Sequence, residues 1–228
     1  MQVFHYSGIG QRKVNQDRIV ALHLGDDSGL YIIADGMGGY SNGAEAAELV
    51  ANVIADYVLA RMDDFNPEAL LKQALIEANR QLSIRRYTYG CVTMGTVVAL
   101  TLVLDGTAYC TWLGDSRIYH YRKGLLLFVS TDHSALKEWS TKKVLSPAQI
   151  ERYSNLVTRC IKGDDDLGPI EVITLHLQDG DTLFLCSDGL YKKTNIEQLP
   201  SDNDELRQFL QHSTSLFDDN YSIIKLNV

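Results

Sequence analysis

The chain has 228 residues, of which 45% are hydrophobic and 22% are charged, and its formal net charge is −8. This composition is typical of an ordinary globular protein and not of a disordered one, and the length suits a single domain over residues 1–228. No run of Lys and Arg is long enough to follow a nucleic-acid backbone. The N-terminus lacks a basic segment followed by an apolar one, and no apolar stretch approaches about 18 residues, so we expect a cytoplasmic protein without a membrane partner.

The first third of the chain predicts two strands followed by two helices. Apolar and β-branched runs at residues 18–24 and 30–34 flank the turn sequence Gly-Asp-Asp-Ser-Gly, which indicates a hairpin. Residues 43–62 repeat apolar side chains at helical spacing, which predicts a long amphipathic helix. A second helix is expected to begin at Asn66-Pro67, where a capping residue precedes a proline in the first turn.

The middle third predicts strands joined by tight turns. Asp105-Gly106 and Lys123-Gly124 are residue pairs of the type that closes β-hairpins. Because these pairs separate apolar runs, we expect one antiparallel meander here. The predicted strands are residues 95–104, 107–113, 117–121 and 125–129.

The last third predicts an insert and then further strands. Residues 135–153 have a looser pattern, in which Ser146 and Gln149 match a capping box that opens a short helix. The other predicted elements are strands at residues 170–177, 182–186 and 221–228 and a capped helix at residues 202–211. Hairpins dominate over crossovers, so the sequence predicts an α+β fold in which two antiparallel sheets pack face to face with helices outside.

The four cysteines are Cys91, Cys110, Cys160 and Cys186, and they are widely separated in the sequence. They form no Cys-x-x-Cys pair, which indicates reduced thiols rather than a disulfide framework. Cys110 and Cys186 lie in apolar strand-like runs, so we interpret them as buried small hydrophobes and not as nucleophiles.

Four aspartates carry the first functional signal. Asp35, Asp115, Asp188 and Asp219 each lie at the end of a predicted strand or just before one. One such residue is ordinarily a turn residue, but four carboxylates at strand ends can meet at one edge of a sandwich, where cations must offset their repulsion. Oxygen ligands favour hard ions such as Mg²⁺, Mn²⁺ or Ca²⁺ over Zn²⁺.

Two neighbouring segments add to this signal. The strand that ends at Asp35 enters a glycine-rich turn at Gly36, which would let the Asp35 carboxylate and the Gly36 carbonyl approach the same ion. Arg12 lies five residues before Asp17. Arg12 could clamp a phosphate through two hydrogen bonds while Asp17 holds a metal-bound water.

These residues belong to a series of motifs that covers nearly the whole chain. The motifs are residues 10–17, Asp35-Gly36-Met37-Gly38-Gly39, Met94-Gly95-Thr96, Gly114-Asp115-Ser116-Arg117, Asp132-His133-Ser134, Ser187-Asp188-Gly189-Leu190 and Asp219-Asn220-Tyr221-Ser222. In order and spacing they resemble the PPM family, the phosphatase 2C type, and above all its compact bacterial members. The resemblance implies a metal-dependent Ser/Thr protein phosphatase with a four-layer α-β-β-α sandwich, whose metals sit at one end of the two sheets.

The resemblance also implies the metal ligands. Asp35 would bridge two Mg²⁺ or Mn²⁺ ions. The Gly36 carbonyl, Asp188 and Asp219 would complete the protein ligands of these two ions.

Further roles follow from the same resemblance. Asp17 would orient metal-bound water, Asp115 would join Asp188 in holding a third and weaker ion, and Arg12 would bind the phosphate. A hydroxide between two cations would then attack phosphorus in line, without a covalent phosphoenzyme.

The sequence departs from the family pattern at a few positions. Gln16 stands where many members have Glu, which predicts lower metal affinity. Met37 stands where some eukaryotic members use a histidine as general acid. His133 is expected to satisfy a loop hydrogen bond, with proton transfer as the alternative. Residues 135–153 match the position of the family's flap, where substrate contacts vary.

The sequence leaves two other functions open. A pseudo-phosphatase that binds phosphoproteins would not need all four aspartates and Arg12, and a structural Ca²⁺-binding sandwich would not need Arg12. The resemblance implies a phosphoprotein substrate and, as its counterpart, a Ser/Thr kinase. Since no long exposed apolar run is evident, we expect a monomer.

Overall fold

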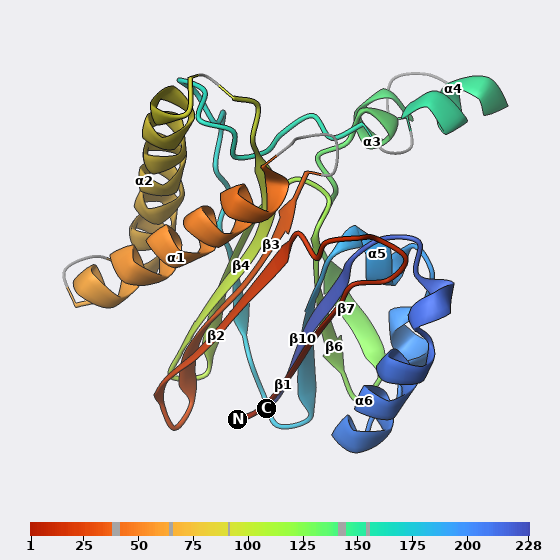
Figure 1. The fold of residues 1–228 in the computed structure, drawn as a ribbon. Coiled ribbons are helices and arrows are strands. Elements are labelled where there is room, and N and C mark those ends of the chain that lie inside the picture. Colours follow the sequence, from red (N-terminus) through yellow and green to blue (C-terminus); the bar gives the residue numbers. More distant parts are fainter. Residues whose placement is uncertain (38–41, 64–65, 91, 141–144, 154–155) are drawn as a thin grey trace.

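The computed structural model describes residues 1–37, 42–63, 66–90, 92–140, 145–153 and 156–228. Its strands form two five-stranded sheets in which all paired neighbours are antiparallel (Figure 1). The first sheet has the order β1 (Gln2–Gly8), β10 (Tyr221–Asn227), β9 (Asp181–Cys186), β6 (Arg117–Arg122) and β7 (Leu125–Val129). The second sheet has the order β2 (Asp17–Gly25), β3 (Ser28–Gly36), β4 (Thr96–Leu104), β5 (Thr107–Leu113) and β8 (Ile173–His176).

Strand β3 shows how the layers are held together. Its side chains alternate between the two faces of the sheet, and both faces are buried. Tyr31 and Ile33 pack in the layer between the sheets, together with Leu185 of β9. Leu30 and Ile32 pack instead in the layer beneath the helices. A strand covered on both faces explains why this segment is a continuous apolar run rather than an alternating one.

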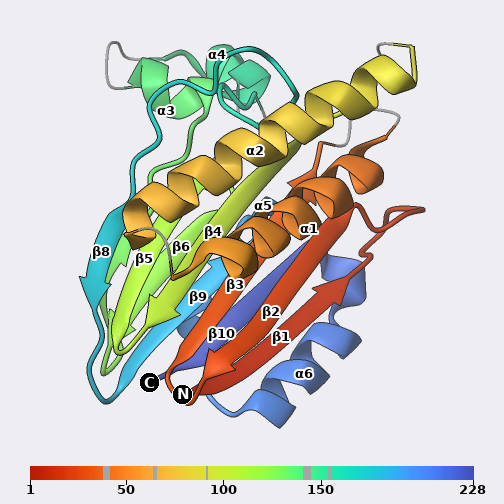
Figure 2. The ribbon, with the colours of Figure 1, turned by 90° about the vertical axis from the view of Figure 1, so that its left-hand side faces the viewer.

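Helices cover the outer face of each sheet (Figures 1 and 2). The second sheet carries α1 (Gly43–Arg61) and α2 (Pro67–Thr88), and the first carries α5 (Asp188–Tyr191), η1 (Ile196–Gln198), α6 (Asn203–His212) and η2 (Thr214–Leu216). The cap predicted for α2 is present, since the Asn66 side chain accepts a hydrogen bond from the Ala69 N–H at 2.7 Å. The predicted four-layer α-β-β-α sandwich is confirmed. None of the helices in the described ranges is long and apolar enough to cross a membrane.

The prediction of one meander across the middle third is wrong. β4 and β5 pair in the second sheet, whereas β6 and β7 pair in the first, so the chain changes sheets between Leu113 and Arg117. Both predicted hairpin turns are present, with positive φ angles of 45° and 75° at Asp105-Gly106. The sheet change places the Asp115 segment at one end of the sandwich.

Strand β1 was not predicted from the sequence. It pairs along its whole length with β10, from Gln2 opposite Asn227 to Gly8 opposite Tyr221. The two chain ends consequently lie side by side (Figure 1). The first and last strands together form one side of the first sheet.

The predicted insert contains two helices, α3 (Ala135–Ser140) and α4 (Pro147–Tyr153), which extend away from the sandwich (Figure 1). The predicted capping box is confirmed, because the Ser146 N–H donates to Gln149 Oε1 at 3.0 Å and the Gln149 N–H donates to Ser146 Oγ at 3.4 Å. Helix α3 was not predicted. Residues 141–144 of the insert lie outside the described residues.

The cysteines agree with the prediction where they are described. Cys110, Cys160 and Cys186 are free thiols, and Cys110 and Cys186 are buried. Cys91 lies outside the described residues. Burial raises the pKa of the Cys110 thiol to about 12, so this side chain packs as a neutral hydrophobe.

Candidate active site

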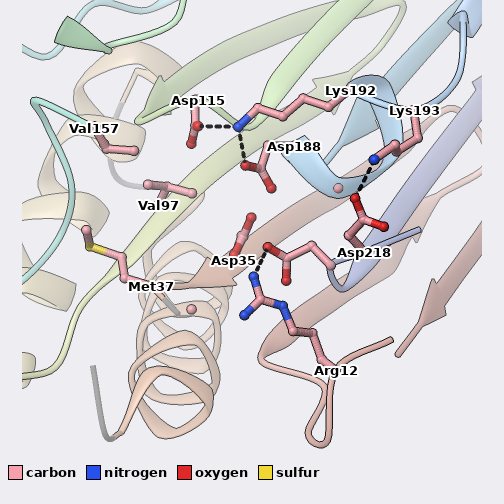
Figure 3. A pocket seen from close by; sticks show the side chains of 13 residues that line it. Arg12, Asp35, Met37, Val97, Asp115, Val157, Asp188, Lys192, Lys193 and Asp218 are labelled. Atoms are coloured by element: carbon pink, nitrogen blue, oxygen red, sulfur yellow. Dashed lines mark hydrogen bonds and ion pairs between the residues drawn. The ribbon is translucent and has the colours of Figure 1, made fainter. Parts of the chain in front are cut away.

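A cavity of about 610 Å³ opens at one end of the sandwich (Figure 3). It lies where β3 ends, where the chain crosses from β5 to β6, where α5 begins, and just before β10 begins. These segments come from both sheets and from distant parts of the sequence. Its charged lining residues are Arg12, Asp35, Asp115, Asp188, Lys192, Lys193, Asp218 and Asp219. The predicted convergence of Asp35, Asp115, Asp188 and Asp219 is therefore confirmed.

Asp35 lies near the end of β3, and its partner in the register of β2 is Asp17. Loss of hydration on burial is the largest of the effects that raise the pKa of Asp35 well above its ordinary value. The negative charges of Asp17, Asp188 and Asp115 raise it further. A carboxylate in this position is costly for the fold unless positive charge is close.

Asp17 lies beside the cavity and is held by two hydroxyl groups. Its Oδ2 accepts hydrogen bonds from Ser187 Oγ at 2.8 Å and from Ser222 Oγ at 2.7 Å. Its Oδ1 is buried and has no hydrogen-bond partner among the described residues. Burial raises the pKa of Asp17 to about 6, with the charge of Asp188 adding to the increase, although both serines lower it. One oriented acceptor thus remains for a water or an ion.

Gly36 permits a close approach of backbones at the cavity. A Cβ at this position would lie 2.3 Å from the Gly43 carbonyl oxygen and 2.9 Å from that of Gln16, which excludes any larger residue. The Gly36 N–H donates to the Gln16 carbonyl at 3.1 Å. Gln16 therefore holds the turn after Asp35 through its backbone, whatever its side chain contributes. Gly38 and Gly39 of the same motif lie outside the described residues.

Gly114 fixes the segment that carries Asp115. Its φ of +116° is strained for any residue with a side chain, and a Cβ here would lie 2.2 Å from the Val97 side chain. Asp115 itself is 7% exposed. Burial raises its pKa to about 6, the charge of Asp188 raises it further, and Lys192 lowers it.

Arg12 lies at the mouth of the cavity on the segment that follows β1. Its Nη2 contacts Asp219 Oδ2 at 2.7 Å, and both side chains are about half exposed, at 48% and 40%. The guanidinium predicted to bind phosphate is therefore within reach of the carboxylates (Figure 3). In this position it neutralises one of the predicted metal ligands.

Two lysines extend from the end of α5 into the cavity (Figure 3). Lys192 Nζ contacts Asp188 Oδ2 at 2.7 Å, and Lys193 pairs with Asp218. These lysines were not predicted from the sequence, because two lysines after a short apolar turn ordinarily mark a solvated surface. The signal that could have found Lys192 is its spacing of four residues from Asp188, which is one helical turn.

The serines that hold Asp17 were also not predicted from the sequence. Ser187 and Ser222 lie in two of the motifs, directly before Asp188 and one residue after Tyr221, but their hydroxyl groups carried no separate prediction. Asn220 is a further support, because its Oδ1 accepts from the Gln16 N–H at 2.9 Å. These contacts hold the N-terminal segment against the start of β10.

His133 does not belong to the residues that line the cavity. Its Nδ1 accepts a hydrogen bond from the Gly114 N–H at 3.2 Å. Its ring stacks on that of Trp112, with the two ring centroids 6.1 Å apart. Burial and, secondly, the charge of Arg159 lower the pKa of His133 to about 4, so the ring is neutral at neutral pH. The predicted loop hydrogen bond is confirmed.

The donor set suits a hard divalent cation. Every ligand atom offered by the predicted metal residues is a carboxylate or carbonyl oxygen. In the described parts of the chain, no three His, Cys, Asp or Glu side chains are grouped so that they could hold one ion as they stand. Asp188 and Asp219 contact Lys192 and Arg12 instead. The fit to a cation rests on the crowded carboxylates and on the unpartnered Oδ1 of Asp17.

Comparison with known proteins extends this agreement to nearly the whole chain. The sequence profile of the family described as "Protein phosphatase 2C" matches residues 6–226. Protein phosphatase PhpP of Streptococcus pneumoniae serotype 2 is 29% identical over 197 residues, which cover 83% of this chain and 79% of the relative.

Two solved structures show the same fold. PppA of Pseudomonas aeruginosa is 27% identical with a TM-score of 0.77, and the match covers 99% of this chain and 96% of PppA. The catalytic domain of the serine/threonine phosphatase PstP was solved with two manganese ions. It is 22% identical with a TM-score of 0.78, over 98% of this chain and 96% of that domain. The chain therefore belongs to the protein phosphatase 2C family of serine/threonine protein phosphatases.

Proposed function

We propose that this phosphatase hydrolyses phosphoserine and phosphothreonine side chains of proteins with the help of two Mg²⁺ or Mn²⁺ ions held in the cavity at the end of the sandwich. The observation that carries this proposal is the cavity itself. It combines crowded, partly buried carboxylates, which need cations, with a guanidinium at the mouth, which suits a phosphate.

The proposal assigns ligands as the resemblance does. Asp35, the Gly36 carbonyl, Asp188 and Asp219 would hold the two ions. When bound, the ions would supply a nucleophile from water at neutral pH and neutralise charge on the phosphoryl group. The whole of residues 1–228 would act as one phosphatase domain, with residues 135–153 as a flap beside the substrate.

The remaining residues act on water and on the substrate. The Oδ1 of Asp17 would accept a hydrogen bond from the attacking water and so orient it. Arg12, which contacts Asp219 in this structure, would turn its free guanidinium edge to two oxygens of the phosphate. The leaving serine or threonine oxygen would take its proton from water in the cavity.

The test is hydrolysis of a chromogenic phosphomonoester by protein stripped with EDTA, before and after Mn²⁺ or Mg²⁺ is restored. We expect activity to return with either ion in the wild type and to remain absent in Asp35→Ala. Asp204→Ala, which removes an exposed carboxylate from the first turn of α6, is the matched control and should behave as the wild type. No turnover at saturating Mn²⁺ would contradict the proposal and favour a pseudo-phosphatase.

The substrate class has its own test. Peptides of one sequence that carry phosphoserine, phosphothreonine or phosphotyrosine would be compared by release of inorganic phosphate. We expect the first two to be cleaved in preference to the third. We also propose that the enzyme opposes a Ser/Thr kinase and acts as a monomer. Co-purification with the substrates of that kinase would test the first proposal, and sedimentation would test the second.

A further inference from the structure

Lys192 lies between two carboxylates that line the cavity (Figure 3). Its Nζ is 2.7 Å from Asp188 Oδ2 and 3.8 Å from Asp115 Oδ2. Asp188 and Asp115 are the two residues that the family resemblance associates with a third, weakly held ion. A positive charge of the chain itself therefore occupies the space between these two ligands.

The surrounding contacts hold this arrangement in place. Lys192 follows the single turn of α5, and its N–H donates to the Asp188 carbonyl at 3.0 Å. Its neighbour Tyr191 donates from its hydroxyl group to the Asp115 carbonyl at 2.9 Å. The Tyr191 ring is covered in turn by the Arg117 guanidinium at 3.7 Å. Adjacent residues thus fix both sides of the gap that the ammonium fills.

All three groups of this contact are partly buried. The Lys192 side chain is 32% exposed, and those of Asp115 and Asp188 are 10% and 21% exposed. Because water is partly excluded, the attraction between the ammonium group and the carboxylates is stronger than on an open surface. The two carboxylates therefore share one ammonium group as their counter-charge.

We propose that Lys192 is a built-in cation that takes the place of the third metal ion, so that this phosphatase holds two divalent ions instead of three. This inference rests on the proposed two-ion function. A divalent ion between Asp188 and Asp115 would have to displace an ammonium group that already contacts both carboxylates. Because the two cations repel each other and need the same oxygen atoms, they exclude one another.

The consequence for catalysis is a simpler dependence on metal concentration. With Lys192 in place, activity should rise with Mn²⁺ to one plateau and show no second phase at higher concentration. The lysine also keeps Asp188 oriented through a direct hydrogen bond, so one predicted ligand of the two-ion centre is preorganised. Lys192 acts here as a positioning residue and not as a group that touches the substrate.

The experiment counts bound ions rather than turnover. Mn²⁺ would be titrated into EDTA-stripped protein, with free Mn²⁺ measured by its electron paramagnetic resonance signal. We expect two ions per chain in the wild type and three in Lys192→Met, with the third bound at least about tenfold more tightly than any third ion in the wild type. Lys193→Met, which removes the adjacent lysine from Asp218, is the matched control and should bind two.

Further variants separate the inference from folding and from the proposed function. Lys192→Arg retains a cation and should bind two ions, whereas Lys192→Gln should bind three if Lys192→Met fails to fold. Asp115→Asn should leave the wild-type count at two but abolish the third ion in the Lys192→Met background. Three ions in the wild type, or an unchanged count in Lys192→Met, would overturn the inference alone. A wild type that binds no Mn²⁺ would contradict the proposed function itself.

Discussion

Strand β9 runs between two acidic environments, a buried ion-pair cluster at its start and the partly exposed carboxylates of the cavity beyond its end. Asp181 opens the strand, and Asp188 follows it at the cavity. Asp181 Oδ1 contacts Arg122 Nε at 2.7 Å, and Asp181 Oδ2 contacts His120 Nε2 at 2.9 Å. The Gln178 N–H also donates to Asp181 at 2.9 Å. Asp181 is therefore fully paired.

The pKa values of the aspartates are shifted in opposite directions in the two environments. The hydrogen bond from Arg122 is the largest effect that lowers the pKa of Asp181 well below its ordinary range. At the cavity, burial and mutual repulsion raise the pKa values of Asp35, Asp17 and Asp115. The Asp181 cluster stabilises the fold, whereas the cavity keeps three carboxylates whose mutual repulsion the fold alone does not offset. Such a strained set of like charges is what a cation-dependent site requires.

Removing one cavity carboxylate should produce the largest effect. For Asp35→Asn we expect hydrolysis to fall by about 10³-fold or more, since an ion held at a developing charge contributes several kcal/mol. In EDTA the same variant should be more stable than the wild type, because a repelled buried charge is gone. Turnover assays measure the loss of activity, and urea unfolding in EDTA measures the gain in stability. A variant that loses both activity and stability would contradict the contrast with Asp181.

Breaking the paired end should do the reverse. Asp181→Asn removes the negative charge and one of the two acceptor oxygens that Arg122 and His120 share, and we expect a loss of about 3 kcal/mol in the free energy of unfolding. Well below the unfolding temperature, kcat should stay within about threefold of the wild type, since the cluster lies at the other end of β9. Urea unfolding and steady-state kinetics measure both. A large fall in kcat with unchanged stability would show that the Asp181 cluster and the cavity do not have separate roles.

The stability of metal-free protein should depend on pH with a sign set by the cavity. Asp17 and Asp115 have pKa values raised to about 6, so the folded state binds more protons than the unfolded state between about pH 4 and 6. In EDTA the free energy of unfolding should therefore be greater at pH 5 than at pH 7, by about 2 kcal/mol. Below about pH 4 the trend should reverse, because the unfolded chain takes up a proton at Asp181 while the folded state, in which the pKa of Asp181 is lowered, does not. Saturating Mn²⁺ should abolish the fall between pH 5 and 7.

His133 is a further test of the comparison, because it lies close to the cavity but has hydrogen-bond partners, as Asp181 does. For His133→Ala we expect a loss of about 1 kcal/mol in stability from the bond to Gly114. Since its pKa is lowered to about 4, the ring stays neutral and kcat should change by less than about threefold. Thermal unfolding and the pH dependence of kcat test this. Loss of a kinetic pKa in the variant would place His133 among the proton-transfer groups.

The sequence predicted most of the long elements and the convergence of the aspartates. α1 and α2 have apolar faces with clear helical spacing, and α2 has a capping residue and a proline at its start. Asp35 and Asp188 could be placed at one edge because each lies at, or just after, the end of a buried strand. These signals are local, so a single sequence reveals them.

The missed features depend on contacts between distant segments. β1 is short and mostly not buried, with only Phe4 and Gly8 buried, and its partner lies at the other end of the chain. The change of sheet after Leu113 is decided by the pairing of β6 with β9, which no turn residue announces. The role proposed for Lys192 depends on its proximity to Asp115, which only the folded chain shows.

The pairing of the first and last strands also has a consequence for biosynthesis. Arg12 follows β1, Asp219 precedes β10, and β10 lies between β1 and β9 in the sheet. A ribosome releases β1 long before its only neighbour in that sheet exists, so this strand must wait until β10 emerges and inserts. We therefore expect the contact between Arg12 and Asp219 to form only after synthesis has passed residue 227 and β10 is complete.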